Sequence, residues 1–137
     1  MKSITVDATV ENLEKVQSFI ETELEKNDCP AKAMMQISMA VEEIYVNIAR
    51  YAYNPEVGKA TVLCSVEGEP LQVMLQFLDN GHPFDPLAFK DADTTLPAGE
   101  REIGGLGILL VKKSMDQISY DYQEGQNILT LKKRLQT

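Results

Sequence analysis

The feature that most constrains this fold is the order in which two hydrophobic periods follow each other along the chain. A period of two predicts a strand, and apolar residues at steps of three and four predict a helix. The strand period occupies residues 2–7, 59–67, 70–79, 117–123 and 127–135. The helix period occupies residues 10–26, 30–53 and 104–115. Strands and helices therefore do not alternate as in a doubly wound parallel sheet. The order predicts an α+β fold, a two-layer sandwich in which a mainly antiparallel sheet of about five strands is covered on one face by three helices.

Length and charge limit the classes of function. With 137 residues and no internal repeat, the chain is expected to form one domain over 1–137. Lys and Arg number 13 against 21 Asp and Glu, giving a net charge of -8. This balance counts against nucleic acid or an anionic membrane as the partner, because both require a basic surface. No apolar run is long enough for a spanning helix and no signal-peptide core follows Met1, so we expect a cytoplasmic protein.

Cysteine and histidine are scarce. Cys29 and Cys64 lie far apart without a CxxC spacing, which favours reduced thiols that serve in packing. His82 is the single histidine, and no cysteine cluster accompanies it. A zinc site is therefore not expected.

The helix predicted over 30–53 carries two series of residues at steps of three and four. One series is apolar and predicts the face that packs on the core. Its members are Met34, Ile37, Val41, Ile44 and Ile48. The second series runs beside it and consists of Gln36, Ala40, Glu43, Asn47 and Arg50. Glu43 and Asn47 are one turn apart and point the same way, so they belong either to a solvated flank or to the wall of a pocket.

The strand predicted over 70–79 places a carboxylate on its core face. Its apolar residues occupy odd positions, and the same alternation brings Asp79 to that face. A carboxylate there is costly unless it receives hydrogen bonds. Two donors fit, namely the backbone of the following Asn80-Gly81 turn or an exocyclic amine of a bound ligand.

Regular patterning stops from Asn80 to Ile103, a stretch that contains three prolines. Structureless stretches of this length inside a compact domain are uncommon, and they are often lids or binding loops. Gly104, Gly105 and Gly107 follow, where a loop enters a helix, and bare N–H groups at such an end suit phosphate. They match neither the Walker loop nor the dinucleotide fingerprint, so a flexible hinge is the alternative.

The three segments together resemble the Bergerat-type nucleotide fold of gyrase, histidine kinases, heat-shock chaperone ATPases and mismatch-repair ATPases. More narrowly, the chain resembles the small bacterial anti-sigma factors that are serine protein kinases. The residues that carry this resemblance are Glu42-Glu43-Ile44-Tyr45-Val46-Asn47, Asp79-Asn80-Gly81-His82-Pro83-Phe84 and Gly104-Gly105-Leu106-Gly107-Ile108, with similar text at 112–116 and 127–131.

The resemblance implies a role for each matching residue. Asn47 would hold Mg²⁺, Asp79 would accept from the adenine amino group of ATP, and Thr130 would assist Asp79. Gly81 would let the backbone pass close to the base, and Phe84 closes the same motif. A lid at about 85–103 would exclude water. The phosphates would receive N–H groups from Gly104, Gly105, Leu106 and Gly107. Glu43 would be the general base that takes the proton of a protein serine.

The chain departs from the family pattern after Asn47, where relatives often have a histidine. Arg50 stands there, and it either reaches a phosphate or lies on the surface. His82, in a Gly-His-Pro turn, is expected to be exposed and non-catalytic. Arg101, between Glu100 and Glu102, is expected to be solvated.

The implied function is an ATP- and Mg²⁺-dependent protein serine kinase that acts as an anti-sigma factor. It would phosphorylate a serine of an anti-anti-sigma antagonist and hold or release a sigma factor, and relatives of this kind are often homodimers. The alternative is a nucleotide-gated binding module without phosphotransfer. The catalytic half of a sensor histidine kinase would need a phosphoacceptor histidine on a helix, and a gyrase-type ATPase would need more chain.

Overall fold

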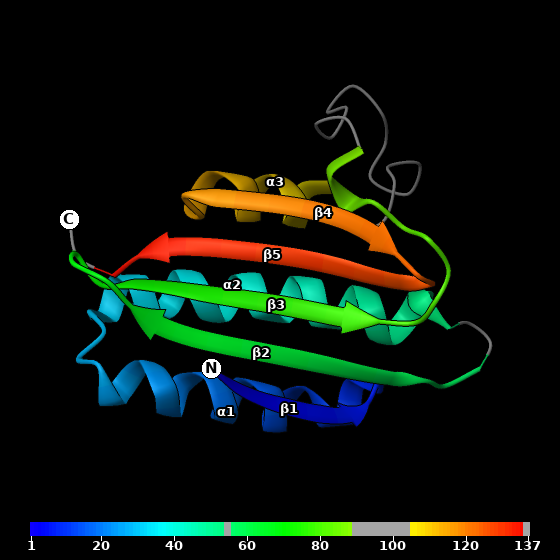
Figure 1. The fold of residues 1–137 in the computed structure, drawn as a ribbon, viewed down its shortest axis with the longest axis horizontal. Coiled ribbons are helices and arrows are strands. Elements are labelled where there is room, and N and C mark those ends of the chain that lie inside the picture. The colour runs from blue at the N-terminus through cyan, green and yellow to red at the C-terminus, as the bar shows by residue number, and fades with distance from the viewer. Residues whose placement is uncertain (54–55, 89–104, 136–137) are drawn as a thin grey trace.

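The computed structural model describes residues 1–53, 56–88 and 105–135. The strands in these ranges form one antiparallel sheet in the order β1-β2-β3-β5-β4. They are β1 (Lys2–Asp7), β2 (Lys59–Glu67), β3 (Gln72–Asp79), β4 (Gln117–Gln123) and β5 (Gln126–Arg134). The helices α1 (Leu13–Lys26), α2 (Ala31–Asn47) and α3 (Gly105–Ser114) lie on one face of this sheet (Figure 1). The predicted α+β sandwich is confirmed.

Two helices differ from their predicted bounds. The residues expected to open the first helix form a separate 3-10 helix, Val10–Asn12 (η1). The second helix, expected to reach residue 53, ends at Asn47 and continues as a π-helical turn, Ile48–Ala52 (η2). The Ala52 carbonyl oxygen accepts a hydrogen bond of 2.9 Å from the backbone N–H of His82, so this turn is tied to a distant segment. Single π turns inside helices are frequent at functional sites.

The segment after β3 is described as far as residue 88. It contains a short 3-10 helix, Pro86–Ala88 (η3). Most of the predicted lid at 85–103, together with Arg101, lies outside the described residues.

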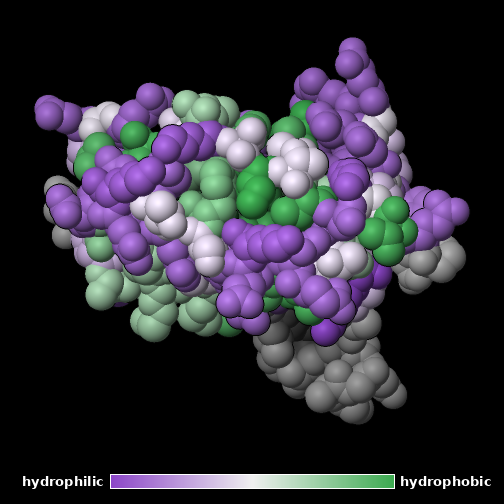
Figure 2. All heavy atoms as spheres, turned by 90° about the horizontal axis from the view of Figure 1, so that it is seen from below, coloured by the Kyte–Doolittle hydropathy of each residue, from purple (hydrophilic) through white to green (hydrophobic). Residues whose placement is uncertain are grey.

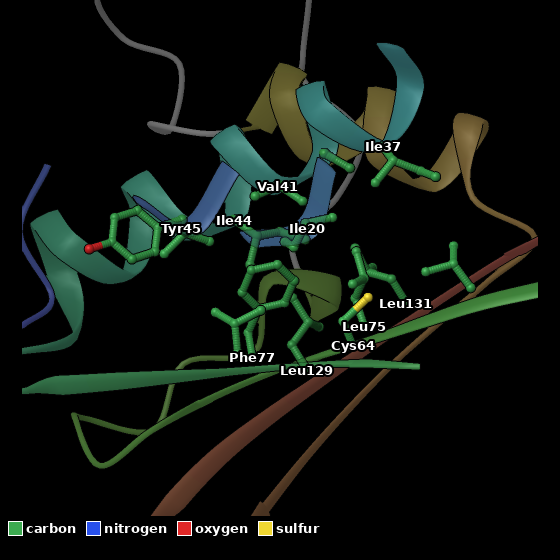
Figure 3. Close-up of a cluster of buried hydrophobic side chains, with 14 of the residues drawn as sticks. Ile20, Ile37, Val41, Ile44, Tyr45, Cys64, Leu75, Phe77, Leu129 and Leu131 are labelled. Atoms are coloured by element: carbon green, nitrogen blue, oxygen red, sulfur yellow. The ribbon is translucent and has the colours of Figure 1, made fainter. Parts of the chain in front are cut away.

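The core fills the space between the sheet and the helices (Figure 3). Val73, Leu75 and Phe77 are each 1% exposed, which confirms that the odd positions of β3 face inward. Opposite them lie buried residues of α1 and α2. These are Val16, Ile20, Leu24, Ile37, Val41, Ile44 and Tyr45. Cys64 is buried in the same cluster as a free thiol.

Strand β1 forms one edge of the sheet, beside α1. A shallow groove on this side is lined by Ile4, Phe19 and polar residues of α1 such as Glu14 and Ser18. Figure 2 shows this edge of the molecule, where an apolar area lies among hydrophilic side chains. None of the helices that the structure describes is both long and apolar enough to cross a membrane.

Candidate functional site

Glu43 and Asn47 lie on the same flank of α2, as their spacing predicts. Asn47 Nδ2 donates a hydrogen bond of 3.2 Å to Glu43 Oε1, and both residues are half-buried. The amide nitrogen of Asn47 donates to Glu43, so the amide oxygen of Asn47 is the atom that can bind another partner. The two side chains therefore form a connected pair rather than two independent surface groups.

The carboxylate of Glu43 also lies against the first turn of α3. A Cβ added to Gly107 would stand 2.1 Å from Glu43 Cδ, closer than any real contact. Glu43 and Gly107 line a groove between α2 and α3, together with Met39, Val46 and Leu110. We call this the α2–α3 groove. Met39 and Leu110 are both 55% exposed, so the groove opens to solvent beside the Glu43 carboxylate.

Asp79 ends β3 with its side chain on the inner face of the sheet and is 5% exposed. Its Oδ1 accepts two hydrogen bonds of 2.9 Å, from the backbone N–H of Gly81 and from Asn127 Nδ2. One of the two donors considered for this carboxylate, the backbone of the Asn80-Gly81 turn, is thus present. Among the described residues, none donates to Asp79 Oδ2. That oxygen remains available to a donor from the pocket.

Asn127 is a site residue that the sequence analysis missed. It pairs with Asp79 across the β3–β5 ladder and is 6% exposed. The alternation of β5 contained the signal, because Asn127, Leu129 and Leu131 share one face just as Phe77 and Asp79 do on β3.

A pocket forms between the inner face of the sheet and the end of α2, and we call it the Asp79 pocket. Asn47 lines one side of it, and Asp79 and Asn127 line another. The remaining lining residues are apolar or aromatic. They are Ile44, Ile48, Tyr51, Ala52, Phe77, Phe84, Pro86, Ile108, Tyr120 and Leu129. A flat, largely apolar ligand that carries one hydrogen-bond donor fits such a lining.

Gly81 makes a close approach that no other residue type allows. A Cβ there would stand 2.2 Å from the carbonyl oxygen of Ala52. The glycine therefore lets the segment after β3 pass directly beside η2, which carries three of the residues that line the Asp79 pocket, Ile48, Tyr51 and Ala52.

Thr130 does not lie where the sequence analysis expected it. It is on the opposite face of β5 from Asn127 and Leu129, and its hydroxyl accepts a hydrogen bond of 3.2 Å from Gln76 Nε2. The sheet separates it from Asp79, so the expectation that Thr130 assists Asp79 does not agree with this geometry. Asn127 occupies that place.

The remaining predicted site residues lie in different parts of the structure. Arg50 is exposed on η2 and is not among the residues that line the Asp79 pocket. Gly105 and Leu106 belong to the first turn of α3, and Gly104 lies outside the described residues. His82 is exposed, as expected.

The described residues contain no group of three or more His, Cys, Asp and Glu side chains arranged to hold a metal. The donor set nevertheless fits a magnesium ion that is bound mainly by phosphates and water, since such sites need only one or two protein oxygens. The amide oxygen of Asn47, at the wall of the Asp79 pocket, is such an oxygen, and none of the described residues donates to it.

Comparison with known proteins agrees with this arrangement. Residues 6–133 match the model of the histidine kinase-like ATPase domain. The chain is 30% identical over 100 residues to the serine-protein kinase RsbW of Bacillus cereus strain G9842, which covers 70% of this chain and 61% of that protein. It is 30% identical over 106 residues to the serine-protein kinase RsbW of Listeria monocytogenes strain EGD-e, which covers 74% of this chain and 66% of that protein. The chain thus spans less than two thirds of the length of these relatives.

Proposed function

Because the chain belongs to the histidine kinase-like ATPase domain family, we propose that it is an ATP-dependent protein serine kinase of the anti-sigma type. ATP would bind in the Asp79 pocket, and its γ-phosphate would pass to a serine of an anti-anti-sigma protein. The relatives that are named serine-protein kinases support the class of reaction. The sigma factor and its antagonist enter the proposal through the family resemblance.

One observation carries the nucleotide assignment. None of the described residues donates to Asp79 Oδ2, and this carboxylate lines a pocket whose other walls are mostly apolar and aromatic. The exocyclic amine of adenine supplies the donor that this oxygen lacks, and the ring supplies the flat apolar surface. Gly81 and Phe84 lie on the segment beside this base site, and Phe84 is part of the lining.

We assign the phosphate end of the nucleotide to the opposite side of the pocket. Asn47 would hold Mg²⁺ through its amide oxygen, and the bound ion would neutralise charge on the phosphates. The start of α3 supports binding of the phosphates, because its first N–H groups have no partner within the helix. The proposed donors there are Gly104, Gly105, Leu106 and Gly107. Arg50, exposed one turn beyond Asn47, is a candidate for a further phosphate contact.

Glu43 is proposed as the general base. As the serine oxygen forms its bond to the γ-phosphorus, the bond from that phosphorus to the bridging oxygen of ADP breaks and the serine proton moves to the Glu43 carboxylate. The carboxylate lines the α2–α3 groove, and it contacts Asn47, which lines the Asp79 pocket. A hydroxyl approaching through the groove would therefore meet a phosphate held in the pocket.

The variant Glu43→Gln tests the proposal, with Glu25→Gln on the exposed side of α1 as its control. We expect calorimetry to show Mg-ATP binding in all three proteins. Labelled ATP and a candidate antagonist protein should give label on the antagonist, reduced about 10²- to 10⁴-fold in Glu43→Gln alone. ATP binding without any label would favour the nucleotide-gated binding module. Absence of ATP binding at millimolar concentration would contradict both.

A further inference from the structure

The geometry points to Asn127 as the residue that sets which nucleotide base the site accepts. We infer that its amide fixes the Asp79 carboxylate so that one acceptor oxygen faces the pocket, which selects a 6-amino purine over a 6-oxo purine. This deepens the proposed function and rests on it. Asn127 is a positioning residue, since it acts through Asp79.

All the hydrogen-bonding capacity of the Asn127 amide is used. Nδ2 donates to Asp79 Oδ1 at 2.9 Å and to the backbone carbonyl of His82 at 2.8 Å. Oδ1 accepts from the backbone N–H of Phe84 at 3.2 Å and from the Tyr120 hydroxyl. An amide has two donors and an oxygen with two lone pairs, so nothing is left over.

These four partners also fix the direction of the amide. Turning it by half a rotation would place Oδ1 against the Asp79 carboxylate and the His82 carbonyl, where two acceptors would face each other. The amide nitrogen would then meet the Phe84 N–H. Because burial makes unmet hydrogen bonds costly, only the observed direction is stable. Asp79 therefore always faces a donor on the Asn127 side.

The direction of the amide determines what Asp79 offers to a ligand. Its Oδ1 receives Asn127 Nδ2 and the Gly81 N–H, so the carboxylate is held from two sides. None of the described residues donates to its Oδ2, which as a carboxylate oxygen only accepts. An amino group at position 6 of a purine satisfies it, whereas an oxo group would present a second acceptor. Sites built to hydrogen-bond one substrate group reject analogues that lack it strongly.

The same amide connects base recognition to the segment after β3. The His82 carbonyl and the Phe84 N–H bind the two ends of one side chain that also holds Asp79. Removing the amide would release the carboxylate and this segment together.

Inosine triphosphate is the probe, because it differs from ATP by an oxo group at position 6. We would measure the affinity for Mg-ATP and for Mg-ITP by calorimetry. The proteins compared are the parent and the variants Asn127→Asp, Asn127→Ser and Thr130→Val. Asn127→Asp puts two carboxyl groups within hydrogen-bond distance, and such pairs share a proton. When that proton lies instead on the outer oxygen of Asp79, the resulting carboxylic O–H can donate to an oxo group. Asn127→Ser keeps the core intact but is too short to reach Asp79 and His82 at once.

We expect the parent to prefer ATP over ITP by about 100-fold or more. The preference should fall at least about 10-fold in both Asn127 variants. It should stay unchanged in Thr130→Val, which alters the same strand on its other face. Equal losses for both nucleotides in the Asn127 variants would mean a structural role only and would overturn the inference. Equal affinity of the parent for ATP and ITP would overturn it while leaving the kinase proposal intact. A parent that binds neither nucleotide would overturn both.

Discussion

The carboxylate of Glu43 rests on the bare Cα of Gly107, where a methyl group would stand only 2.1 Å from Glu43 Cδ. At this point α2 and α3 thus meet through a glycine and an acidic side chain. Since the atom in the way is the end of a flexible side chain, a larger residue at 107 would displace the carboxylate rather than the helix.

The first prediction is that Gly107→Ala separates stability from activity. Alanine favours a helix over glycine by about 1 kcal/mol, so the unfolding free energy should stay level or rise slightly. Phosphotransfer should fall about 10- to 100-fold, because a displacement of about 1 Å is costly in catalysis. Thermal unfolding and labelled-ATP assays on the same preparation measure both quantities. A destabilised variant with full activity would contradict the geometry.

Gly81→Ala, in contrast, should lower the stability of the fold. The added methyl group would stand 2.2 Å from the Ala52 carbonyl oxygen and 2.6 Å from its carbon, and this backbone of η2 has little room to move. We expect the unfolding free energy to fall by about 1–3 kcal/mol, measured by urea titration. Gly107→Ala is the matched control, because it adds the same group beside a movable neighbour.

Asn47→Ala should remove the magnesium dependence of nucleotide binding. If the amide oxygen holds the ion, the affinity gained by adding Mg²⁺ to ADP should drop by about 10-fold or more. Binding of ADP in the presence of EDTA should change little, since the adenine contacts remain. Calorimetry with and without Mg²⁺ separates the two contributions, and an unchanged magnesium effect would rule Asn47 out as a ligand.

The two cysteines should react very differently. Burial raises the pKa of Cys64 to about 11 from its ordinary 9.0, so only about 0.1% of it is thiolate at pH 8. Cys29 is half-buried, and loss of contact with water raises its pKa as well. Iodoacetamide at pH 8 should therefore modify Cys29 slowly in the folded chain and reach Cys64 only in urea. Mass spectrometry of the alkylated peptides would detect the order.

The Cys64 thiol makes the free energy of unfolding depend on pH. Between about pH 9 and 11 the Cys64 thiol ionises in the unfolded chain but keeps its proton in the folded one. Its contribution to stability is therefore complete below pH 9 and is lost as the pH rises through this window. Cys64→Ala should show a flatter stability curve there than the parent chain, measured by chemical denaturation at each pH.

Local patterns in the sequence were sufficient to predict the fold and one residue of the base site, Asp79. The alternation in β3 places Asp79 inside without knowledge of any partner, and the helical spacing places Glu43 beside Asn47. These are properties of a single element, and an element's period survives folding unchanged.

The misplaced residues depend on contacts between distant parts of the chain. The alternation of β5 indicates that Asn127 faces inward, but only the β3–β5 register brings it opposite Asp79. The role expected for Thr130 came from the family resemblance and not from this alternation, which places Thr130 on the face opposite Asn127. A hydrogen bond from the backbone N–H of His82 to the carbonyl oxygen of Ala52 likewise joins the π turn η2 to a distant segment. Register and close backbone approach are set by the assembled sheet, so no local period reports them.

The pair formed by Glu43 and Asn47 stands between two separate openings, the α2–α3 groove on one side and the Asp79 pocket on the other. Two reactants that arrive by different entrances need not leave in a fixed sequence. A phosphorylated protein would be free to depart while ADP stays behind, so turnover would have a random kinetic order and ADP would compete with ATP without competing with the acceptor.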